Sequence, residues 1–134
     1  MAADGGFFDL ADEHVLRLPP DPHQLRAARR FVCDSIAEWG AAPLQEAALI
    51  TSEVVGNAIV HAGTEIEVRV RRDGRSALVE VHDHSSKLPL PQPHDPLRTG
   101  GNGMRIIDAL ASDWGVTEIR DDGKIVWFEV PLAI

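Results

Sequence analysis

The spacing of apolar residues changes from a helical to a strand period near residue 63, and this change restricts the fold more than any other feature of the chain. Between residues 43 and 62, a stripe of mostly apolar residues falls on one side of a helix when each residue is advanced by about 100°. The stripe consists of Leu44, Ala47, Ala48, Thr51, Val55, Ala58, Ile59 and Ala62. From residue 65 onward apolar and polar residues alternate, which is typical of a strand. The chain is therefore predicted to join helices to a sheet.

Cap and turn residues divide the rest of the chain into further elements. We expect a strand at 14–18, helices at 21–40 and 43–62, a hairpin of strands 66–71 and 77–82, a helix from residue 103, and a hairpin of strands 116–120 and 124–130. Four prolines between residues 84 and 102 predict a long loop there. Structureless loops of this length are usually functional or disordered.

Length, charge and cysteine content limit the class of protein. The 134 residues suffice for one domain, which we expect at 14–134 after a flexible N-terminal arm at 1–13. The chain has 21 acidic and 13 basic residues and a net charge of −8, which disfavours nucleic-acid binding because a phosphate-backbone binder carries a basic stripe. The single Cys33 cannot form an internal disulfide, and neither an export signal nor a membrane-spanning apolar run is present. We therefore expect a cytoplasmic protein with no membrane contact.

Three polar residues repeat at intervals of four on the second predicted helix. Glu53, Asn57 and His61 form a row that points away from the apolar stripe by well over a right angle. The amide oxygen of Asn57 is a hard ligand suited to Mg²⁺ beside phosphate oxygens, and Glu53 could take a proton from an attacking hydroxyl. The alternative is an ordinary solvated polar face.

Two further signals follow along the chain. Alternation places Asp83 on the same face as Val79 and Val81, where its carboxylate could accept a hydrogen bond from an exocyclic amine such as that of adenine, or could cap the turn that follows. The run Gly100-Gly101-Asn102-Gly103 leads into a helix N-terminus, where free N–H groups attract phosphate. A hinge before a helix is the alternative for these glycines.

Metal and cysteine chemistry are less favoured. His82 and His84 flank Asp83 and could join His61 in a zinc cluster. Alternation sends His82 to the face opposite Asp83, however, and zinc requires converging ligands, so we do not expect zinc. Cys33 fits a helix core position better than a nucleophile.

The order of these signals resembles the GHKL nucleotide-binding superfamily, which includes gyrase and the histidine kinases. The segments at 49–58 (LITSEVVGNA) and 103–110 (GMRIIDAL) are most similar to its small stand-alone branch, which contains the anti-sigma-factor serine kinases of bacterial partner-switching systems. The similarity extends from about residue 14 to 132.

This resemblance implies an α+β fold, a two-layer sandwich of the Bergerat ATP-binding type. Its sheet would be mixed and mostly antiparallel, with three helices on one face. The cofactors would be ATP and Mg²⁺, with Asn57 holding the metal, Glu53 acting as general base and Asp83 binding the adenine amine. The phosphates would lie near Gly101, Gly103 and Met104, with Arg98 and Arg105 countering the γ-phosphate charge. The loop at 84–100 would become the ATP lid.

The resemblance also implies an activity and partners. The chain would be a serine/threonine protein kinase that binds a sigma factor and phosphorylates a small antagonist protein. Whether it forms a homodimer is left open. Two departures concern the adenine side. The family often has the run D-x-G-x-G at this aspartate, whereas here His84-Ser85-Ser86-Lys87 follows Asp83, and Lys124 follows Gly123 where the family usually has a threonine. These departures favour an alternative function, a binding module with weak or no catalysis that sequesters a regulatory partner.

Overall fold

The computed structural model describes residues 12–85 and 103–133, apart from the side chains of residues 103 and 104. Five strands form one sheet in the order β1-β2-β3-β5-β4. They are β1 (Glu13–Leu18), β2 (Ile66–Asp73), β3 (Ser76–Asp83), β4 (Asp113–Glu118) and β5 (Lys124–Pro131). Every pairing between these described strands is antiparallel, so the parallel component of the expected mixed sheet is not found among them.

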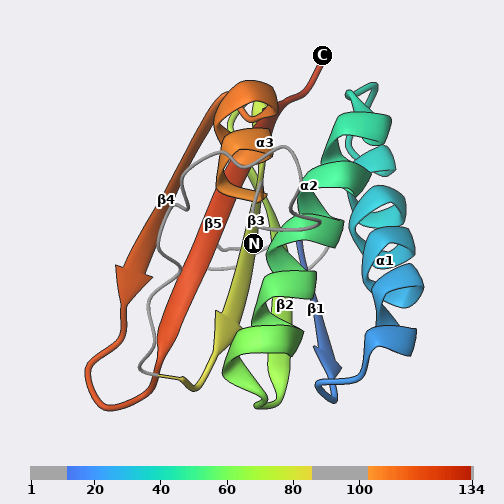
Figure 1. Cartoon of the computed structure of the whole chain (residues 1–134). Helices are drawn as coiled ribbons and strands as arrows, with labels where there is room; N and C mark the ends of the chain where they lie inside the picture. The colour runs from blue at the N-terminus through green and yellow to red at the C-terminus, as the bar shows by residue number, and fades with distance from the viewer. Residues whose placement is uncertain (1–11, 86–102, 134) are drawn as a thin grey trace, which may run out of the picture.

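Helices form a second layer on one face of the sheet (Figure 1). They are α1 (Leu25–Ala37), α2 (Leu44–Asn57) and α3 (Gly103–Leu110), with short turns η2 (Pro22–Gln24) and η3 (Ala58–Ala62). Asp21 caps the start of η2, because its carboxylate accepts the N–H of His23 at 2.9 Å. The predicted α+β sandwich, with three α-helices on one side of a sheet, is thus confirmed.

The second predicted helix changes its geometry before its end. The α-helix stops at Asn57, and η3 continues it as a π-helical turn, in which the N–H of Gly63 donates to the carbonyl of Ala58 five residues earlier. Gly63 then adopts the left-handed conformation, with φ of 65°, that ends a helix. The expected end near residue 62 is correct, whereas the expectation of one regular α-helix to that point is wrong.

Strand β4 also begins earlier than expected, at Asp113 instead of residue 116. The indole N–H of Trp114 donates to the carboxylate of Asp108 in α3 at 3.0 Å. This contact holds the start of β4 against the preceding helix, so the chain enters the sheet almost directly after α3. Gly115 gave no strand signal in the sequence, which explains the displaced boundary.

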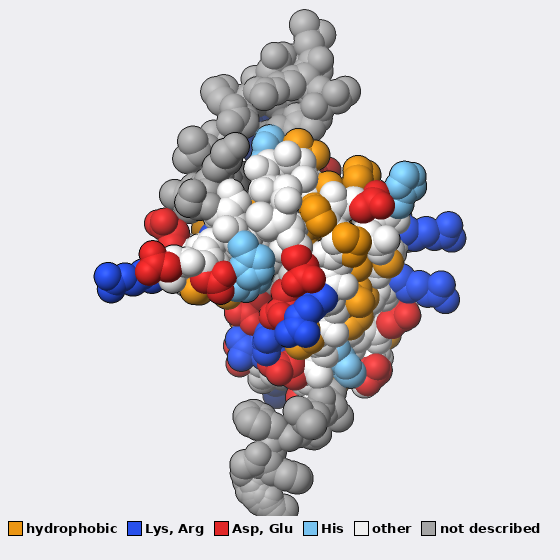
Figure 2. All heavy atoms as spheres, turned by 90° about the horizontal axis from the view of Figure 1, so that it is seen from below, with side chains coloured by type: hydrophobic (Ala, Val, Ile, Leu, Met, Phe, Trp, Pro, Cys, Tyr) orange, Lys and Arg blue, Asp and Glu red, His pale blue; other side chains and the backbone are white. Residues whose placement is uncertain are grey.

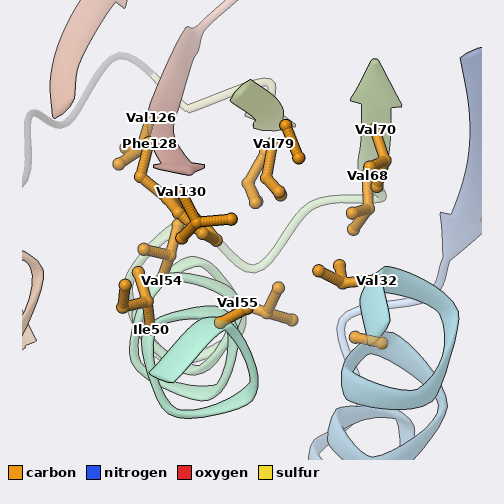
Figure 3. Packing of buried hydrophobic residues seen from close by; sticks show 14 of the residues in the cluster. Val32, Ile50, Val54, Val55, Val68, Val70, Val79, Val126, Phe128 and Val130 are labelled. Atoms are coloured by element: carbon orange, nitrogen blue, oxygen red, sulfur yellow. The ribbon is translucent and has the colours of Figure 1, made fainter. Parts of the chain in front are cut away.

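The core lies between the helices and the sheet. Figure 3 shows valines of β2 and β3 pointing toward Val32 of α1 and Val55 of α2, while Ile50 and Val54 lie on the other side of α2, toward β5. Alternate residues on the opposite face of the sheet are charged and pair across strands, as Arg17 does with Glu67 at 3.1 Å. The predicted alternation therefore holds, with one face of the sheet in the core and the other charged.

Candidate functional site

Glu53 and Asn57 lie one turn apart on α2, both partly buried. The hydroxyl of Ser52 accepts a hydrogen bond from Arg29 of α1 at 3.2 Å, so that side of α2 faces α1. Advancing about 100° per residue from Ser52 places Glu53 and Asn57 about 100° and 140° further around the helix. The two side chains are therefore on the side turned away from α1, next to Ile50 and Val54.

The π-helical turn separates His61 from this row. The turn begins directly after Asn57, and its wider bonding pattern breaks the four-residue repeat that linked Asn57 to His61. His61 is exposed. Glu53 and Asn57 therefore remain in one row on α2, as predicted, whereas His61 lies in the π-helical turn and does not continue that row. Single π-turns inside helices are frequently found at functional sites.

Asp83 is the last residue of β3 and is 1% exposed, on the helix-covered face, as predicted. Its Oδ1 accepts the N–H of Ser85 at 2.9 Å and the ammonium of Lys124 at 3.0 Å. The first contact is the turn cap that was one of the two alternatives for this residue. The second contact makes Asp83 part of a buried ion pair, which neither alternative included.

Lys124 is a residue of the candidate site to which the sequence analysis gave no role. It lies directly opposite Asp83 in the pairing of β3 with β5, and it is 5% exposed. The sequence signal was its position after Gly123, but its reach to Asp83 depends on the register of two strands about 40 residues apart in the chain. Burial of both charged groups in contact makes the pair sensitive to loss of either partner.

Gly123 lets this pair form. It has φ of 81°, and a methyl carbon placed on it would overlap the backbone of Asp83 and His84. Only glycine permits so close an approach at a left-handed position. The turn before β5 therefore packs against the end of β3, at the edge where the carboxylate of Asp83 lies.

The structure describes only some of the residues that were predicted to lie near the phosphates. Arg98 and Gly101, together with most of the predicted lid, lie outside the described residues. Gly103 begins α3 and Met104 follows it in the same helix, while the side chain of Arg105 is exposed. Their assignment to phosphate stays a prediction, as do the roles of Glu53 and Asn57.

The described side chains suit parts of a nucleotide site. Asn57 offers an amide oxygen next to the carboxylate of Glu53, a donor set of the kind that Mg²⁺ accepts. In its hydrogen bonds to described residues, Asp83 accepts through Oδ1. A carboxylate has about four lone-pair sites, so Asp83 retains the capacity to accept a further N–H from a base at Oδ2. The chain's own residues therefore fit Mg²⁺ and an amine-bearing base.

A helix-covered antiparallel sheet with these groups along α2 and at the end of β3 is the arrangement of an ATP-binding domain of the GHKL class. The sequence profile of the histidine kinase-like ATPase domain matches residues 18–130. Because that match covers most of the chain, the protein belongs to the histidine kinase-like ATPase family. A search of curated proteins found no match to this chain. No helix among residues 12–85 and 103–133 is long and apolar enough to cross a membrane.

Proposed function

We propose that this protein is an ATP-dependent serine/threonine protein kinase that phosphorylates a small antagonist protein and also binds a sigma factor. The observation that carries the proposal is the pair of Glu53 and Asn57, partly buried on one side of α2 in a chain of an ATP-binding family. Membership of the family supports ATP binding and phosphoryl transfer in general. The serine or threonine acceptor and the partner-switching role belong to this proposal.

The proposed chemistry assigns one task to each side chain on α2. Bound ATP would supply the transferable γ-phosphoryl group, and Asn57 would hold Mg²⁺ through its amide oxygen. Glu53 would take the proton of the acceptor hydroxyl. The hydroxyl oxygen would then bond to the γ-phosphorus while the bond from that phosphorus to the ADP oxygen breaks. Asp83 would accept the adenine amine at Oδ2, beside its bonds to Ser85 and Lys124.

The remaining proposed groups surround the phosphates. Gly101 and Gly103 would offer backbone N–H groups at the start of α3, with Met104 beside them. Arg98 and Arg105 would neutralise charge on the γ-phosphate. A kinase of this kind would act in the cytoplasm on protein partners, without direct contact to nucleic acid.

A transfer assay tests the kinase function. Labelled γ-phosphate should pass from ATP to a serine or threonine of a candidate antagonist protein, and Glu53→Gln should slow the transfer by about 10²-fold or more because the general base is lost. Glu46→Gln is a matched control, since Glu46 lies seven residues earlier, two turns away on the same side of α2. Transfer by Glu53→Gln at the rate of Glu46→Gln would refute the role of Glu53.

A binding module without catalysis is the second candidate, and the ion pair of Asp83 with Lys124 favours it. An adenine amine must share the carboxylate with an ammonium already 3.0 Å away, which weakens recognition of the base. A pure binder should capture its protein partner equally well with Glu53 or Gln at that position and should show no transfer of phosphate. Comparing the wild type with Glu53→Gln in both partner capture and phosphate transfer therefore distinguishes the kinase from the binding module.

A further inference from the structure

Two histidines and one aspartate meet where β3 ends beside the turn between β4 and β5. The side chains are His82, His84 and Asp122, and one potential ligand atom from each lies within 4.8 Å of the others. Nδ1 of His84 is 2.5 Å from Oδ1 of Asp122, and Nε2 of His82 is 3.8 Å from Oδ2 of the same carboxylate. In Figure 2, which looks onto the lower end of the molecule, histidine and acidic side chains lie side by side on the surface.

The fold brings these residues together through two local features. Gly123 packs against the backbone of Asp83 and His84, which draws the turn onto the end of β3. Asp121 adopts a left-handed conformation with φ of 61°, and the N–H of Asp122 donates to the carbonyl of Ile119 at 2.9 Å. Asp122 is thereby held over the last residues of β3, on the opposite side from the buried pair of Asp83 and Lys124.

The sequence expectation was correct about His82, but it considered only a cluster with His61 and did not consider Asp122. Alternation does send His82 to the face opposite Asp83, but His84 lies beyond the strand and is free of that alternation. The third member is Asp122, which is 38 residues away from His84 in the chain, whereas His61 is not part of the cluster. Convergence of the ligands, which was the reason for disfavouring zinc, is therefore present among different residues.

We propose that His82, His84 and Asp122 bind a divalent transition-metal ion, with Zn²⁺ as the best match. Two imidazoles and one carboxylate suit Zn²⁺ and similar ions, whereas Mg²⁺ and Ca²⁺ prefer oxygen ligands throughout. Three protein ligands leave a fourth position to water. His84 directly follows Asp83 in the chain, but the proposed metal site uses only these three side chains and does not depend on the nucleotide chemistry proposed above.

The distances require only side-chain adjustment. Ligand atoms about 2.1 Å from a common tetrahedral zinc ion lie about 3.4 Å apart, so the widest present spacing must close by roughly 1.4 Å. The side chains of His84 and Asp122 are 42% and 52% exposed, which leaves them free to rotate. His82, at 19% exposed, supplies the more rigid ligand.

Metal binding exchanges existing hydrogen bonds for coordinate bonds. His82 Nε2 now lies 2.8 Å from the carbonyl oxygen of Asp122, so it donates a proton there. Coordination through Nε2 needs the tautomer with hydrogen on Nδ1, and His84, if bound through Nδ1, needs hydrogen on Nε2. Both are neutral imidazole forms. A bound ion would clasp the β4–β5 turn to the end of β3.

Zinc titration of the full metal-free chain tests the proposal. Calorimetry should show one equivalent of Zn²⁺ bound, and Co²⁺ as a substitute should give the visible absorption of a tetrahedral site. His84→Ala and Asp122→Asn should each weaken the affinity by about tenfold or more. His23→Ala is the matched control, because His23 pairs with Asp21 at 2.9 Å in an exposed contact that has one imidazole only.

Two results would overturn the proposal. One is the absence of stoichiometric zinc binding by the wild type, and the other is unchanged affinity in both His84→Ala and Asp122→Asn. Circular dichroism of each variant without metal establishes that it is folded, so that a lost site is not confused with a lost fold. Zinc should also raise the melting temperature of the wild type and of His23→Ala, but not that of His84→Ala.

Discussion

At the scale of single residues, breaking the buried ion pair of Asp83 and Lys124 should lower the free energy of unfolding substantially. Asp83→Asn leaves the ammonium without its counter-charge, and Lys124→Met leaves the carboxylate without one, so each should lower the free energy of unfolding by about 3–5 kcal/mol. The double variant removes both charges and should cost less than the sum of the single changes by about 1–3 kcal/mol. Urea denaturation of the four proteins measures this coupling.

An exposed pair in the same chain is the control for that cycle. Arg30 and Asp34 are 3.9 Å apart and largely exposed on α1, so their variants should be additive to within about 0.5 kcal/mol. Equal and additive costs at Asp83 and Lys124 would mean that the buried contact contributes no more than a surface contact, contrary to its burial.

Cys33 gives a second residue-scale prediction. Burial raises the pKa of its thiol, nearby Asp34 acts in the same direction, and the thiol lies 3.5 Å from the carbonyl oxygen of Leu44. Less thiolate is therefore present near pH 8 in the folded chain than in the unfolded chain. An aromatic disulfide reagent should label the single cysteine of the native protein more slowly than that of the urea-unfolded protein. Equal rates would contradict the raised pKa.

The sequence predicted the position of a single side chain correctly where that position depends only on a local pattern. Strand alternation correctly placed Asp83 on the core face, because side chains of successive residues point to opposite faces. Its partner Lys124 was noted only as a departure from the family. Local alternation states on which face a side chain lies, but the identity of its neighbour depends on strand order and register, which form only in the assembled sheet.

At the scale of elements, the turn before β5 should tolerate no side chain at residue 123. Gly123→Ala should lower the free energy of unfolding by about 3 kcal/mol or more, because the added methyl combines left-handed strain with overlap of the β3 backbone. Gly74→Ala is the matched control. Gly74 also has positive φ, of 62°, but a methyl there meets no atom within 4 Å, so only the strain of about 1–2 kcal/mol applies.

Chemical denaturation measures both glycine variants under the same conditions. Equal costs at the two glycines would mean that the turn can move away from β3. The proposed metal site and the pair of Asp83 and Lys124 both depend on that close approach, so a mobile turn would argue against both arrangements at this end of the sheet.

Element type was more predictable than element geometry. The change of hydrophobic period correctly separated helices from strands. Residues 58–62 contain neither glycine nor proline, so nothing local marks the change from α to π bonding after Asn57. The change from α to π bonding therefore could not be predicted from the local sequence. It is also the reason that His61 leaves the row of Glu53 and Asn57.

At the scale of the whole molecule, the fold and family follow from the sequence more fully than the site does. Three helices on one face of a mixed, mostly antiparallel sheet were expected. The three helices are present, every pairing between the described strands is antiparallel, and the family profile covers residues 18–130. The proposed site draws on α2, the end of β3 and the start of α3. Bringing these elements together is a property of the complete sandwich, and the phosphate-side residues Arg98 and Gly101 lie outside its described part.

Calorimetric titration of the protein with ATP, with and without Mg²⁺, determines whether the proposed nucleotide site binds its ligand. We expect Mg²⁺-dependent binding by the wild type that is weakened about tenfold or more in Asn57→Ala, because the amide oxygen proposed to hold the metal is removed. Gln45→Ala, at an exposed position near the start of α2, should bind as the wild type does. Absence of ATP binding by the folded wild type, or equal binding by Asn57→Ala and Gln45→Ala, would contradict the proposed site.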